Sequence, residues 1–173
     1  NVYANFVNVM DKDFVSPFND NGDDYYIFSV PDTQIQNGKK IFHFVFRSKH
    51  PGQNTFEGDA WVTAQTYQIQ KISLYLGKDA NINYIDKIKI QQELEPTDAG
   101  PWVPVKMRTL VDVGQLTENS AGMLAKYYVS NKGFIINKPQ DIHFYSDRID
   151  LDEDYKSDEE DTTYWNQKRH DAL

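Results

Sequence analysis

The chain has 173 residues, of which 39% are hydrophobic and 14% aromatic, and it contains no cysteine. This length predicts one domain with a sizeable core, and the missing cysteine excludes disulfides, a thiolate zinc site and a cysteine nucleophile. The formal net charge is −8, and residues 147–161 carry −7 of it through nine acids and two bases. The rest of the chain is nearly neutral and has no cluster of basic residues that could bind a phosphate backbone, which argues against nucleic-acid binding.

No apolar run approaches the about 20 residues that a transmembrane helix needs. No signal peptide is recognised either, and the sequence reads as a segment of a longer protein.

The first expected element is a short amphipathic helix over 1–10. Val2, Phe6 and Val9 lie there at helical spacing, and Ser16-Pro17 sets a limit because the residue before proline avoids the helical region. We expect this helix to cover one face of a sheet.

Seven strands are predicted after it. The clearest pair lies in 55–76, where Phe56, Ala60 and Val62 alternate with polar residues before a polar corner and a returning strand. Such alternation is typical of half-buried antiparallel strands. The expected strands cover 24–30, 40–48, 55–63, 68–76, 83–94, 102–116 and 123–136.

Short polar turns join these strands, including the Asn37-Gly38 signal of a tight hairpin. This spacing predicts a mainly β fold, an antiparallel meander that is strongly curved into a half-barrel. We expect a short N-terminal helix and a short C-terminal helix to accompany it. Residues 1–146 would form the β domain, and 147–173 an acidic connecting segment.

Several short motifs follow one another in an order that suggests a family. They are Ser16-Pro17-Phe18 before Tyr25-Tyr26, the Asn37-Gly38 hairpin, the pair over 56–72, Trp102-Val103-Pro104 and Tyr164-Trp165. In this order they resemble the middle region of a Bacteroidetes outer-membrane family of unknown function, and the pair over 56–72 is similar to lipoprotein-carrier-like sheets.

The resemblance implies a place at the periplasmic face of the outer membrane. The chain would then lie between a carboxypeptidase-D-regulatory-like domain and a C-terminal β-barrel, which are the implied partners. The family brings no catalytic residues with it.

The apolar sides of the predicted strands form the first candidate site. They line either a packed core or a concave groove for a lipid or acyl chain. The residues are Phe42, Phe44, Phe46, Phe56, Val62, Ile72, Leu74, Ile88, Ile90, Val105 and Met107.

The acidic segment is the second candidate site. Asp150, Asp152, Asp154, Asp158 and Asp161 have the spacing of a calcium loop. The alternative is a solvated linker, because Tyr155 stands where such a loop needs glycine for its sharp turn. Residues 162–173 form either a short helix or the entry to a following domain.

Catalytic signatures are not found. The four histidines lack the spacing of a zinc motif, and no G-x-S-x-G elbow occurs. Glu57 and Asp59 share a strand face and are the one carboxylate pair considered as acid and base. We therefore expect a non-enzymatic interaction or spacer module without a cofactor; the alternatives are a carrier or sensor of an apolar ligand and a carboxylate enzyme.

Overall fold

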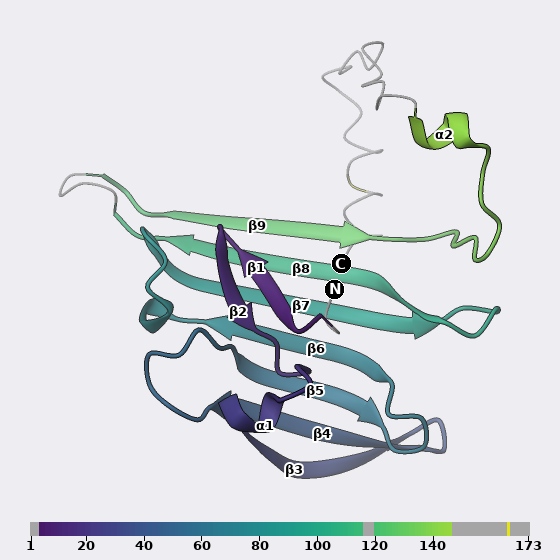
Figure 1. Cartoon of the computed structure of the whole chain (residues 1–173), viewed down its shortest axis with the longest axis horizontal. Coiled ribbons are helices and arrows are strands. Elements are labelled where there is room, and N and C mark those ends of the chain that lie inside the picture. Colours follow the sequence, from purple (N-terminus) through teal and green to yellow (C-terminus); the bar gives the residue numbers. More distant parts are fainter. Residues whose placement is uncertain (1–3, 116–119, 147–165, 167–173) are drawn as a thin grey trace.

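The computed structural model describes residues 4–115, 120–146 and 166, and its centre is one antiparallel sheet (Figure 1). The sheet has seven strands in the order β3-β4-β5-β6-β7-β8-β9, and β1 and β2 form a separate hairpin. The elements are β1 (Phe6–Val9), β2 (Lys12–Val15), α1 (Gly22–Tyr25), β3 (Tyr26–Gln36), β4 (Lys39–Ser48), β5 (Glu57–Thr63), β6 (Ile69–Leu76), the 3-10 turn η1 (Lys78–Ala80), β7 (Ile85–Pro96), β8 (Trp102–Val113), β9 (Met123–Ser130) and α2 (Ile142–Ser146).

Each strand of the large sheet pairs with its neighbours in sequence, so the topology is an up-and-down meander. Within the described residues the sheet does not close into a barrel, and β3 and β9 are its two edges. The predicted mainly β fold and its seven-stranded antiparallel meander are confirmed.

The prediction of a helix over 1–10 is wrong. Phe6–Val9 forms β1, which pairs with β2 in an antiparallel hairpin, and Met10 and Asp11 make its turn with positive φ angles of 50° and 61°, as a tight hairpin turn requires. The valines and aromatics of this short stretch fit a period of two as well as one of 3.6, and pairing with β2 decides between them. The short helix of this region lies later, at α1.

The ends of β3 and β9 differ most from the prediction. β3 continues past Pro31 to Gln36, with a register shift between Ser29 and Asp32, which is possible because proline is tolerated at a sheet edge and at a bulge. β9 ends at Ser130 rather than at 136.

The C-terminal helix predicted over 162–173 lies outside the described residues, apart from Asn166, which is helical.

The core lies between one face of the sheet and the N-terminal segment. Phe14 of β2 is fully buried and its ring centroid lies 5.3 Å from that of Phe56. The buried apolar residues around them are Val15, Tyr26, Phe46, Ala60, Val62, Ile69, Ile72, Leu74, Leu76, Ile88 and Leu94. We call the side of the sheet that carries this core the apolar face.

Tyr26 joins the hairpin to the sheet. Its hydroxyl donates a hydrogen bond to the carbonyl oxygen of Val15 and accepts one of 3.0 Å from the backbone N–H of Phe56. The backbone N–H of Val15 donates to the Asn54 carbonyl oxygen at 2.8 Å. Burial raises the pKa of Tyr26 to about 12, against a smaller lowering from the Phe56 hydrogen bond.

No helix in the described part of the chain has the length and apolar character needed to span a membrane.

Candidate functional site

The predicted apolar binding surface is mostly core. Phe46, Phe56, Val62, Ile72, Leu74 and Ile88 are buried together, and Phe44 and Ile90 pack against them. Phe42, Val105 and Met107 are only half-buried. Because the β1–β2 hairpin covers this face (Figure 1), a lipid there would have to displace the hairpin, and the carrier hypothesis stays a prediction.

The opposite face of the sheet, which we call the polar face, carries a continuous row of side chains. The strand register places Asp32 opposite His43, His43 opposite Trp61 and Trp61 opposite Lys71. It continues through Glu93 to Lys106. This polar row, made of Asp32, His43, Trp61, Lys71, Glu93 and Lys106, crosses six adjacent strands because directly opposed residues share one face.

His43 and Trp61 form the centre of the polar row. Their rings stack with centroids 4.6 Å apart and planes 6° apart, and Lys71 Nζ lies 5.0 Å from the Trp61 ring centroid. His43 Nδ1 is 3.4 Å from Asp32 Oδ2, and its Nε2 is 3.5 Å from Asp59 Oδ2. These neighbours hold Trp61 in one position.

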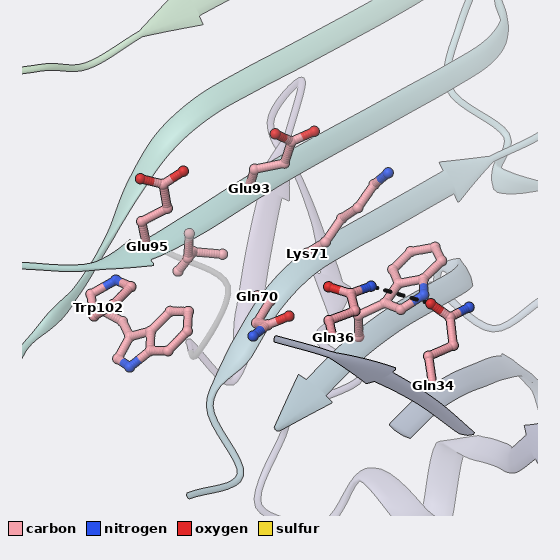
Figure 2. Close-up of a pocket in the computed structure, with 10 residues that line it drawn as sticks. Gln34, Gln36, Gln70, Lys71, Glu93, Glu95 and Trp102 are labelled. Atoms are coloured by element: carbon pink, nitrogen blue, oxygen red, sulfur yellow. Dashed lines mark hydrogen bonds between the residues drawn. The ribbon is translucent and has the colours of Figure 1, made fainter. Parts of the chain in front are cut away.

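A hollow of about 580 Å³ lies at one end of the strands, where polar-face residues such as Trp61 and Lys71 meet Leu94 of the core and Trp102, which packs against the core. Five strands contribute to it: Gln34 and Gln36 from β3, Trp61 from β5, Gln70 and Lys71 from β6, Glu93, Leu94, Glu95 and Pro96 from β7, and Trp102 from β8. Figure 2 shows Trp102 and Glu95 toward one end, Gln34 and Gln36 toward the other, and Gln70 with Lys71 between them. We call this the polar-face hollow.

Two register shifts adjoin the polar-face hollow. One lies between Trp61 and Val62 in the β5–β6 pair, and the other between Glu93 and Leu94 in the β7–β8 pair. A bulge bends its strand and increases the local twist. This bending explains how side chains of β3 and β8 come to line one hollow although four strands separate them.

The sequence analysis did not single out this site. No motif marks it, since its residues come from segments far apart in the chain. The available signal was two tryptophans at strand ends, Trp61 and Trp102, with glutamines near the turns.

Two further hollows lie elsewhere. One of about 740 Å³ lies at the opposite end of the strands, between residues 48–57 and 75–80. Another, of about 540 Å³, lies beside residues 130–134 and includes Val105, the one predicted binding residue that lines any of the three.

The predicted calcium site lies outside the described residues, since all five of its aspartates fall in 150–161. Among the described residues, no three histidine, aspartate or glutamate side chains gather closely enough to hold a metal ion. Of the carboxylate pair considered for catalysis, Glu57 is exposed and Asp59 lies half-buried against His43.

The model of a family of unknown function, DUF5686, matches residues 1–129, and the chain belongs to this family. No significant match was found among curated proteins or among solved structures. The predicted relation to a family of unknown function is thereby confirmed, while the Bacteroidetes origin, the flanking domains and the carrier-like sheet stay predictions.

Proposed function

We propose, with membership of this family as the premise, that the chain is a non-enzymatic interaction module of a larger cell-envelope protein. In this proposal its edge strand β9 pairs with an extended segment of a flanking domain. The observation that carries the proposal is a difference between the two edges of the sheet.

The β3 edge has features that oppose pairing with another strand. Pro31 lacks a backbone N–H, the register shifts between Ser29 and Asp32, and Asp32 adds a charge. Prolines, bulges and charges are the means by which sheet proteins protect exposed edges.

The β9 edge lacks these features. Its eight residues pair with β8 without a register shift, and they include one charged side chain, Lys126. Met123, Leu124, Tyr127 and Tyr128 are exposed, Tyr127 by 63%. The register places Tyr127 on the apolar face and Tyr128 on the polar face, so each side of the edge carries an exposed aromatic side chain, which suits a strand that accepts another strand.

The periplasmic face of the outer membrane is the proposed location. Its support is the sequence resemblance given above, together with membership of the matched family.

Hydrogen exchange tests the proposal. The amides of residues 123–130 would be compared between this chain by itself and a longer protein that contains it. We expect slower exchange in the longer protein for those β9 amides that do not bond to β8. The amides of β3 serve as the control and should not change, and equal β9 exchange in both proteins would disprove the pairing.

Substitutions at the two edges sharpen this test. Tyr127→Lys adds a charge where the partner strand would pack, and Ile35→Lys does the same at the β3 edge, where Ile35 is 78% exposed. We expect Tyr127→Lys to restore fast exchange in β9 of the longer protein and Ile35→Lys to leave it slow. If both substitutions changed the exchange of the β9 amides equally, the slow exchange would not be due to pairing of β9 with a partner strand.

A further inference from the structure

Some of the polar side chains that line the polar-face hollow are paired with each other or with a neighbour, and others have no hydrogen-bond partner in the described part of the chain. Gln36 Nε2 donates to Gln34 Oε1 at 3.2 Å, and Arg108 lies 3.6 Å from Glu93 Oε1. Gln70 and Glu95 have no side-chain hydrogen bond to any other described residue. The site therefore presents amide donors, amide acceptors and carboxylate acceptors together.

Trp102 supplies an apolar surface beside these groups. The strand register places it opposite Pro96, and its ring contacts no other aromatic ring in the part of the chain that the structure describes. Trp61 differs, because His43 stacks on it and the Lys71 ammonium lies over its ring. Trp102 is half-buried: part of its side chain packs against the core, and the rest lines the hollow without another aromatic ring of the described residues over it.

Several ligand classes fit this site poorly. Lys71 is the one cation among the described residues that line the hollow, and it faces the carboxylate of Glu95 together with that of Glu93, which Arg108 already pairs; this charge balance does not favour a phosphate-rich ligand. A peptide that binds by adding a strand needs a free edge, whereas β5, β6 and β7 are interior strands whose backbone groups are paired on both sides. A lipid chain would bury the amides and carboxylates without partners, which costs free energy.

We propose that the polar-face hollow binds a neutral oligosaccharide. Each sugar hydroxyl is both a donor and an acceptor, which matches the mixed groups of Gln70, Glu95 and Lys71. The C–H faces of a sugar ring pack on an aromatic ring, the role of Trp102. The volume of about 580 Å³ lies within the range of about 300–1,000 Å³ common for small-molecule sites.

Calorimetric titration of the whole chain with neutral hexaoses tests the proposal. The probes are malto-, cello-, manno- and N-acetylchito-hexaose, with a hexagalacturonate as the acidic counterpart. We expect at least one neutral hexaose to bind and the acidic one to bind at least tenfold more weakly, because the carboxylate of Glu95, unpaired among the described residues, repels it. Binding of none of the neutral probes at millimolar concentration would overturn the proposal.

Variants then locate the site. Trp102→Ala should weaken binding of the neutral hexaose at least tenfold, and Glu95→Gln, an exposed change that leaves the fold intact, should weaken it several-fold. Tyr84→Ala is the matched control, since Tyr84 is an exposed aromatic at the opposite end of the sheet, and it should bind normally. Unchanged binding in both hollow variants, or stronger binding of a proline-rich peptide than of every sugar, would contradict the assignment.

Discussion

The two faces of the sheet are built from the same strands, yet they meet different surroundings. On β5, Ala60 and Val62 point into a core covered by the β1–β2 hairpin, while Asp59 and Trp61, which alternate with them, lie on the polar face. One face is filled by apolar side chains from a distant segment. The other carries the polar row and the polar-face hollow.

This difference indicates where stability and where binding reside. Burial of apolar area supplies most of the free energy of folding, so changes on the apolar face should unfold the protein. Half-exposed polar groups contribute little to stability and are available to a ligand. Three predictions test this contrast between the faces.

The largest effect is expected from Phe56→Ala. Phe56 is fully buried against Phe14, and truncating a buried phenylalanine costs about 3–5 kcal/mol. Chemical denaturation measures this loss in the free energy of unfolding. Tyr75→Ala, an aromatic truncation on the polar face, is the control and should cost much less; similar losses would show that the faces do not differ.

Alkaline pH should have the next largest effect. The pKa of Tyr26 is raised to about 12 in the folded state, above the value near 10 of an unfolded chain. Its stabilising contribution is therefore complete below pH 10 and is lost between pH 10 and 12, by about 2–3 kcal/mol at about 1.4 kcal/mol per pKa unit.

Denaturation series at rising pH measure this loss. Tyr26→Phe should be less stable at neutral pH, since the Phe56 N–H loses its acceptor, and its stability should fall less between pH 10 and 12 than that of the original chain. Identical pH profiles would mean that other groups cause the alkaline loss.

The smallest effect is expected from His43→Gln. The change removes the stack on Trp61 and the contacts with Asp32 and Asp59, and we expect a cost of about 0.5–1.5 kcal/mol. Arg47→Gln on the same face and strand is the control and should be nearly neutral. A loss of several kcal/mol in His43→Gln would show that the polar row belongs to the core.

Local pattern explains which parts of the fold the sequence predicted. The alternation of Phe56, Ala60 and Val62 with polar residues identified β5 and its faces, because side chains of a strand point to opposite sides in turn. The same alternation predicted all seven strands of the meander, and the acidic segment could be recognised by composition. Over the short stretch of β1, however, two periods fitted, and the sequence analysis chose the helix.

The tertiary structure decided what depends on distant segments. Phe14 and Tyr26 place the β1–β2 hairpin on the apolar face, which turns a predicted binding surface into core. The bulges beside Trp61 and Glu93 bend the sheet so that Gln34 of β3 and Trp102 of β8 line one hollow. The sequence by itself determined the strands and their two faces, because side-chain alternation is local; the cover over one face and the hollow in the other result from curvature and packing between segments far apart in the chain.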